Sequence, residues 1–251
     1  MAAGKQTLKH APIETHSVRN DDIGKDATTM KPQESRNPLQ DLVRDRIQRS
    51  IEVKKLLLLD GNFQNLAAQA AMRIVDSLRA GGKVFFFGNG GSAADAQHLA
   101  AEFVGRYLKE RPALAALALN VNSSSVTAIG NDYGFEYIFA RQLEGLGKQG
   151  DVAVGLSTSG NSRNIVRALE IAKSKSIYTV ALTGASGGIL TNVADCTIRI
   201  PSEETPRIQE CHILMGHIIC EIVEEKLVEN PKVEPSDPDA VANAIRSSSR
   251  D

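Results

Sequence analysis

The chain has 251 residues, of which 42% are hydrophobic and 24% charged, and its formal net charge is −1. This composition is typical of a soluble globular protein, and so small a charge provides no field that would attract nucleic acid or a membrane surface. No stretch approaches the roughly 20 apolar residues of a membrane span, and the N-terminus lacks the apolar core of a signal peptide. The three cysteines show no CxxC spacing and indicate buried thiols in a reducing cytoplasm.

Both ends of the chain are polar. Residues 1–36 contain too few large apolar side chains to offset the entropy lost on ordering, so we expect a disordered tail. Residues 231–251 are also mostly polar and predict a loose C-terminal tail, with a short helix at Asp239–Arg246. A single α/β domain is expected between them, over residues 37–230.

Short apolar runs alternate with segments of helical periodicity inside this domain. The pattern predicts strands at Lys83–Phe87, Ala115–Leu119, Asp151–Leu156, Tyr178–Thr183 and Thr197–Ile200. It predicts helices at Leu39–Leu59, Phe63–Arg79, Ala94–Tyr107, Ser123–Ile129, Phe135–Leu143, Asn164–Lys173 and Arg207–Leu227. Strands that alternate with helices indicate a parallel sheet with helices on both faces.

A glycine turn, residues 88–92 (GNGGS), follows the first predicted strand and precedes a helix. It fits part of the dinucleotide fingerprint, but the second predicted strand is followed by Asn120 and not by the carboxylate that would hold a ribose. It also lacks the Gly-Lys-Ser/Thr ending of a Walker A loop. The remaining alternatives are a small anion at the helix N-terminus or a tight turn that binds nothing.

A serine loop, residues 157–162 (STSGNS), follows the third predicted strand and again precedes a helix. Its hydroxyl groups and the free N–H groups of the helix N-terminus favour a phosphate. Without a lysine, the loop suits a small phosphorylated metabolite better than a triphosphate with magnesium. The alternative is an ordinary serine-rich helix cap.

Titratable side chains follow the glycine turn at helical spacing. Asp95, His98 and Glu102 share one helix face, and His98 with Glu102 could chelate a metal ion. Gln209 and His217 of the last helix are roughly 80° apart around its axis and could point into one cleft. These two pairs could form a site similar to catalytic zinc, although a lone histidine on a helix is usually structural. His212 lies well round the helix from His217 and is expected to pack or to face another subunit.

Six motifs in order resemble the phosphoheptose isomerases of the sugar isomerase (SIS) domain superfamily. They are GNGGS (88–92), DAQHLAAEFVGRY (95–107), GNDYGFEYIFARQ (130–142), STSGNS (157–162), LTGASGG (182–188) and RIQECHILMGH (207–217). The resemblance implies a flavodoxin-like three-layer sandwich with a five-stranded parallel sheet, and a homotetramer with active sites at subunit contacts.

The resemblance also implies roles for individual residues. Substrate contacts fall on Asn89, Gly90, Gly91, Glu102, Asn131, Asp132 and Gln209, a phosphate loop on Ser157, Thr158, Ser159 and Ser162, the acid–base pair on Glu102 and His217, and one zinc ion per subunit on His98, Glu102, Gln209 and His217. Pro206 stands where some relatives carry an aspartate, which puts an auxiliary acid there in doubt.

The activity that the resemblance implies is isomerisation of sedoheptulose 7-phosphate, a phosphorylated ketose, to D-glycero-D-manno-heptose 7-phosphate through an enediol. This would be the first step toward activated heptose. The alternative is a non-catalytic tetrameric scaffold for a replication initiator, because residues 110–120 (ERPALAALALN) also resemble that sister family. Those scaffolds tend to lose the catalytic glutamate and the last histidine, whereas this chain keeps Glu102 and His217. We therefore favour the enzyme.

Overall fold

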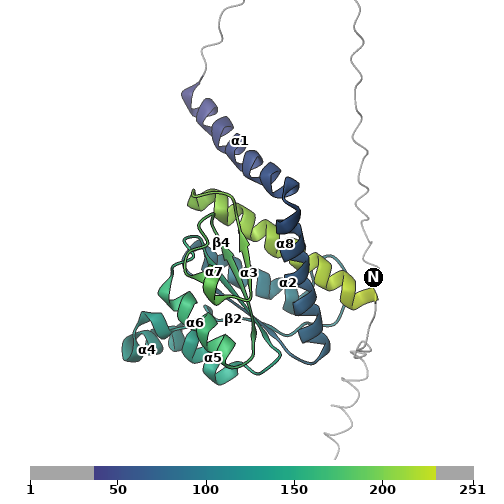
Figure 1. The fold of residues 1–251 in the computed structure, drawn as a ribbon, viewed down its shortest axis with the longest axis vertical. Helices are drawn as coiled ribbons and strands as arrows, with labels where there is room; N and C mark the ends of the chain where they lie inside the picture. Colours follow the sequence, from purple (N-terminus) through teal and green to yellow (C-terminus); the bar gives the residue numbers. More distant parts are fainter. Residues whose placement is uncertain (1–36, 230–251) are drawn as a thin grey trace, which may run out of the picture. The chain divides into compact units, whose positions relative to one another are not determined.

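The computed structural model describes residues 37–229 of the chain (Figure 1). Both predicted tails and the short helix expected at Asp239–Arg246 lie outside the described residues. The chain divides into two units, Met1–Asp41 and Leu42–Asp251, and the fold described below is that of the second. The predicted domain limits, residues 37 and 230, stay predictions.

Five parallel strands form one sheet in the order β2-β1-β3-β4-β5. The strands are β1 (Val84–Gly88), β2 (Ala116–Ala118), β3 (Val152–Ser157), β4 (Tyr178–Thr183) and β5 (Cys196–Arg199). This confirms the predicted five-stranded parallel sheet, and the strand order is the flavodoxin-like one. The chain changes direction across the sheet between β1 and β3, so a crevice is expected at the carboxyl ends of these two strands.

Helices connect the strands and extend the chain at both ends. They are α1 (Pro38–Leu59), α2 (Gly61–Arg79), α3 (Gly91–Val104), α4 (Ser123–Tyr133), the 3₁₀ helix η1 (Phe135–Tyr137), α5 (Ala140–Leu146), α6 (Arg163–Ser174), α7 (Leu190–Val193) and α8 (Thr205–Glu229). The helix predicted at Phe135–Leu143 is divided into η1 and α5, and the short α7 was not predicted.

The limits of α3 differ from the prediction for a physical reason. It begins at Gly91, three residues before the expected start, because the glycine turn passes directly into helical hydrogen bonding at Gly90. It ends at Val104 and not at Tyr107, because the N–H groups of residues 107–109 donate to the Glu224 carboxylate and not to helix carbonyls.

Two apolar clusters cover the two faces of the sheet. Val84 and Phe86 of β1 belong to a cluster that includes side chains of α2, α3 and α8. Phe85 and Phe87 point the other way, into a cluster with side chains of α5 and α6. Successive strand side chains point to opposite faces, so the buried run of β1 serves both clusters. The result is the predicted three-layer sandwich, with α2 and α8 on one side of the strands and α5 and α6 on the other (Figure 1).

Two further expectations can be compared with the structure. The cysteines Cys196, Cys211 and Cys220 are unpaired and buried, as predicted. Within residues 37–229, no helix combines the length and apolar character that crossing a membrane requires.

Candidate functional site

The glycine turn joins β1 to α3 and is tied to the next strand–helix connection. The Ser92 N–H donates to the Asn89 carbonyl over 3.0 Å. The amide side chains of Asn89 and Asn164 exchange two hydrogen bonds of 2.9 and 2.8 Å. Asn164 is buried near the start of α6, so this pair fixes the glycine turn against the helix that follows β3.

The serine loop joins β3 to α6 and brings three hydroxyl groups together. Ser157 Oγ lies 2.9 Å from Ser162 Oγ and 3.5 Å from Ser159 Oγ. Ser157 is buried, whereas Ser159 is exposed. Because α6 begins at Arg163, directly after the loop, these donors stand at a helix N-terminus, where free N–H groups and the helix dipole favour an anion.

The backbone of the serine loop packs against residues 184–190. Gly160 has a φ of +66°, and a Cβ on it would lie 2.1 Å from the Gly187 carbonyl oxygen. The Gly184 N–H donates to the Thr158 carbonyl over 3.0 Å, and the Leu190 N–H donates to the Gly160 carbonyl over 3.1 Å. Only a residue without a side chain fits this approach, so the loop is fixed before any ligand binds.

The two connections meet at a cavity of about 520 Å³, within the size range of small-molecule sites. Its lining comes from both connections and from the segment between α4 and η1: Asn89, Tyr133, Gly134, Phe135, Glu136, Ser162, Arg163 and Asn164. The cavity occupies the expected place, because Asn89 follows β1 and Ser162 follows β3. Asn131 and Asp132 lie exposed just before this lining, joined by a hydrogen bond of 2.8 Å.

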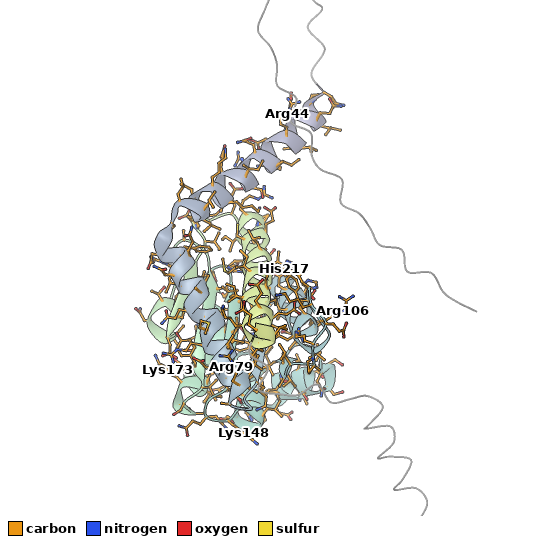
Figure 2. The ribbon with its side chains drawn as sticks, turned by 90° about the vertical axis from the view of Figure 1, so that its right-hand side faces the viewer. Arg44, Arg79, Arg106, Lys148, Lys173 and His217 are labelled. Atoms are coloured by element: carbon orange, nitrogen blue, oxygen red, sulfur yellow. The ribbon has the colours of Figure 1, made fainter. Side chains whose placement is uncertain are left out.

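His98, Glu102 and His217 come together at a different place, where the parallel helices α3 and α8 pack closely. A Cβ on Gly216 would lie 2.4 Å from the Leu99 side chain, so the missing side chain allows the helices to approach. His98 Nε2 lies 2.9 Å from His217 Nε2 and 3.3 Å from Glu102 Oε1. Figure 2 labels His217 on α8. We call His98, Glu102 and His217 the ligand group.

The ligand group has the donor set and the spacing for a metal ion. One ligand atom from each residue lies within 4.8 Å of the others. Zinc held at 2.0–2.1 Å in a tetrahedral site places its ligand atoms about 3.3 Å apart, and two imidazoles with one carboxylate form a known catalytic zinc set with an open position. The residues present therefore fit a divalent metal such as zinc.

Gln209 lies apart from the ligand group. A Cβ on Gly91 would lie 2.6 Å from Gln209 Nε2, so the Gln209 amide lies against the start of α3. Gln209 precedes His217 by eight residues, roughly 12 Å along the helix axis, and its side chain points to the glycine turn. Asp95 is half-buried; burial raises its pKa and His98 opposes that rise.

His212 packs inside the fold, which was one of the two predicted roles. It is fully buried, and its Nε2 lies 3.2 Å from the Thr183 carbonyl oxygen. A carbonyl only accepts, so Nε2 carries the proton in the neutral ring, and Nδ1 finds no hydrogen-bond partner among residues 37–229. Burial lowers the pKa of His212 to about 4.

We expect this histidine to make the fold less stable in mild acid. Its pKa is near 6.5 in the unfolded chain and about 4 in the folded one, so the unfolded chain binds more protons between these values. The stabilisation is complete above pH 6.5 and decreases as the pH falls toward 4, by about 3 kcal/mol. Urea unfolding at pH 7 and pH 5 should show a smaller pH effect in His212→Gln, which keeps a donor but does not titrate. Equal pH effects in both proteins would contradict the assignment.

The structure thus gathers the predicted residues into two sets. The two connections meet at the cavity, and the ligand group forms between α3 and α8. The ligand-group residues do not line the cavity, and His98 lies roughly 10 Å along α3 from Gly91. One chain therefore presents the two halves of the predicted site separately.

Three residues around the ligand group were not assigned a role from the sequence. Tyr107 stacks on His217, with ring centroids 5.6 Å apart, and Arg111 forms a buried ion pair with Glu224. One signal was available in the sequence: Glu224 follows His217 by seven residues and falls on the same helix face, where a charge among apolar residues requires a partner.

Comparison with known proteins agrees with this architecture. Residues 58–184 match the family model described as the SIS domain. The phosphoheptose isomerase of Aneurinibacillus thermoaerophilus is 50% identical over 192 residues, which cover 76% of this chain and 97% of the relative. That of Akkermansia muciniphila is 55% identical over 179 residues, covering 69% of this chain and 95% of the relative.

Solved structures agree as well. A phosphoheptose isomerase from Francisella tularensis superposes with a TM-score of 0.72 at 38% identity, covering 74% of this chain and 98% of that one. One from Neisseria gonorrhoeae gives 0.69 at 41% identity, covering 74% and 99%. These relatives favour the enzyme over the alternative of a replication-initiator scaffold. The chain belongs to the phosphoheptose isomerase family, a family of enzymes built on the SIS domain.

Proposed function

We propose that this chain converts sedoheptulose 7-phosphate into D-glycero-D-manno-heptose 7-phosphate through an enediol, the first step toward activated heptose. The observation that carries the proposal is the position of Glu102. Its carboxylate lies 3.3 Å from His98 Nε2 and in one group with His217, which is the arrangement that a proton transfer next to a carbonyl needs.

The reaction requires three proton movements. The carbon-bound proton leaves C1 of the ketose and returns at C2, O2 gains a proton, and O1 loses one. Glu102 is the proposed carrier between the carbons, and His217 is the proposed acid and base at the oxygens. Glu102 has two carboxylate oxygens, so one can face His98 while the other reaches the substrate.

A zinc ion, about one per chain, completes the proposed centre, held by His98, Glu102 and His217 with Gln209 as the fourth ligand. When bound, it would supply Lewis-acid polarisation of the substrate carbonyl. The donor set of the ligand group supports the first three ligands. The role of Gln209 rests on the sequence alone, on its spacing and on the resemblance, because its amide lies against Gly91.

The proposed phosphate site is the serine loop with the N-terminus of α6. The sugar would extend through the cavity toward Asn89, Gly90 and Gly91, with Asn131 and Asp132 at its rim. The fixed backbone at Gly160 and the grouped hydroxyls support this assignment, because neither has to be ordered on binding.

Alanine at Ser157, Ser159 and Ser162 together should weaken substrate binding at least tenfold. Each hydrogen bond to a charged acceptor is worth about 1.5–3 kcal/mol. The Ser157 and Ser162 hydroxyls bond each other, so replacing both residues avoids leaving one of these hydroxyls without its partner. The measurement is KM, with inorganic phosphate as a competing ligand. Ser174→Ala, an exposed serine at the other end of α6, is the matched control. An unchanged KM in the triple variant would place the phosphate elsewhere.

We further propose that copies of the chain complete each other's sites in a homotetramer. The separation of the cavity from the ligand group supports this. So does a row of exposed apolar side chains at helical spacing on α1: Leu42, Val43, Ile47 and Ile51. A cytoplasmic location is part of the proposal, and the three unpaired cysteines, which suit a reducing compartment, support it.

The test is incubation of purified protein with sedoheptulose 7-phosphate, followed by proton NMR. Appearance of the aldose signal is the expected result. Absence of isomerisation and of solvent exchange with phosphorylated ketoses of five to seven carbons would favour the scaffold alternative.

A further inference from the structure

A buried ion pair lies just beyond the ligand group. Glu224 of α8 is 1% exposed and follows His217 by two helical turns on the same face. Its Oε1 accepts from the Arg111 Nε and the Tyr107 N–H, both over 3.0 Å. Its Oε2 accepts from the next two N–H groups, of residues 108 and 109, both over 2.7 Å. All of its hydrogen bonds thus go to the segment that follows α3.

The partner of Glu224 reaches back to α3. Arg111 Nη2 donates to the Glu102 carbonyl over 2.7 Å, and its Nη1 donates to the Phe103 carbonyl over 2.9 Å. A cation at the C-terminal carbonyls of a helix is favourable. The Arg111–Glu224 pair therefore joins the backbone of Glu102 on α3 to the helix that carries His217.

The same pair places an aromatic ring on the ligand group. Glu224 holds the Tyr107 N–H, and the Tyr107 ring lies over the His217 ring at an interplanar angle of 26°. The His217 ring also contacts the His98 ring in an edge-on arrangement, with 5.1 Å between the ring centroids. The orientation of His217 is therefore set by Tyr107 on one side and by its ligand-group partner on the other.

We propose that Arg111, Glu224 and Tyr107 are positioning residues that set the spacing of α3 and α8 at the ligand group and the orientation of the His217 ring. The proposal rests on the proposed function for its catalytic meaning. A buried ion pair often adds little to the stability of a fold, since an apolar pair of similar volume would stabilise it as well. A metal and acid–base centre built from two helices instead needs its side chains held to about 0.5 Å, which this pair can supply.

The first test uses Tyr107. Full-length protein, freed of bound metal, is titrated with Co²⁺ as the probe, without substrate. Tyr107→Leu should raise the Co²⁺ dissociation constant by about 10–100-fold and change the visible absorption of the bound ion, as loss of an orienting partner does in other metal sites. Tyr107→Phe, which keeps the ring, should restore most of the affinity. Tyr178→Leu removes a half-buried tyrosine on β4 and controls for general destabilisation.

The second test uses Glu224→Gln, with Asp151→Asn as its control. Asp151 is equally buried, accepts from the N–H groups of Lys83 and Lys148, and pairs with the Lys83 ammonium over 2.8 Å, so its partners belong to the segments before β1 and β3 and not to α3 or α8. Both variants should lose stability, but only Glu224→Gln should weaken Co²⁺ binding and lower kcat more than it changes KM.

The outcomes are distinct. Wild-type Co²⁺ affinity in Tyr107→Leu would overturn the proposal, even if Glu224→Gln fails to fold. Equal Co²⁺ binding in folded Glu224→Gln and Asp151→Asn would overturn it too, because the pair would then be merely structural. Wild-type protein that binds no Co²⁺ would also overturn it. Failure of the isomerase assay alone would overturn the proposed function and leave the Co²⁺ result standing.

Discussion

Replacing Glu102 by glutamine should lower turnover by about 10²–10⁴-fold, the usual contribution of a general base. Glutamine keeps the size of the side chain and a hydrogen-bonding oxygen, but its amide oxygen cannot take a proton at neutral pH. Among residues 37–229, the Glu102 carboxylate forms an ion pair with His98 alone, so the fold should tolerate the loss of its charge. The measurement is kcat for the phosphorylated ketose, followed by proton NMR.

Exchange of the substrate's C1 proton with solvent deuterium tests the same proton transfer independently. If Glu102 carries the proton between C1 and C2, incorporation of deuterium at C1 should slow in parallel with turnover. Glu170→Gln, an exposed glutamate on α6 that pairs with Arg167, is the matched control and should retain both rates. Near-normal exchange in Glu102→Gln would remove Glu102 as the base and make His217 the next candidate.

The parts of the site that depend on local sequence could be predicted. The serine loop and the glycine turn each follow an apolar run and precede a helix, so their place at strand ends follows from the order of residues. His98 and Glu102 meet because they are one helical turn apart. A parallel sheet then brings the two connections to one edge, which is why the cavity could be expected.

Contacts between distant segments could not be predicted in this way. The spacing of Gln209 and His217 gave their angle around α8, but their separation along the axis keeps Gln209 at the glycine turn. His217 meets His98 only because Gly216 allows α8 to approach α3. The early end of α3 depends on Glu224, more than 100 residues away along the chain. Propensity and periodicity carry no information on such pairings.

Removal of bound metal should abolish turnover, because the ion that the ligand group would hold polarises the substrate carbonyl. Two imidazole nitrogens 2.9 Å apart must share a proton or a cation, since two lone pairs at that distance repel. Elemental analysis of the purified protein should find about one zinc ion per chain. Chelation should bring activity to background, and added zinc should restore it.

A ligand variant separates loss of metal from loss of fold. His98→Ala removes one nitrogen of the ligand group from a side chain that is 48% exposed, so the fold should persist while zinc content falls with activity. His212→Gln is the matched control, because His212 is buried against Thr183 outside the group and its replacement should cost stability but retain zinc. Full activity in metal-free wild-type protein would exclude a catalytic role for zinc. The acid–base pair Glu102 and His217 would then have to act alone, with the short contact between His98 and His217 serving as a hydrogen bond that orients the second ring.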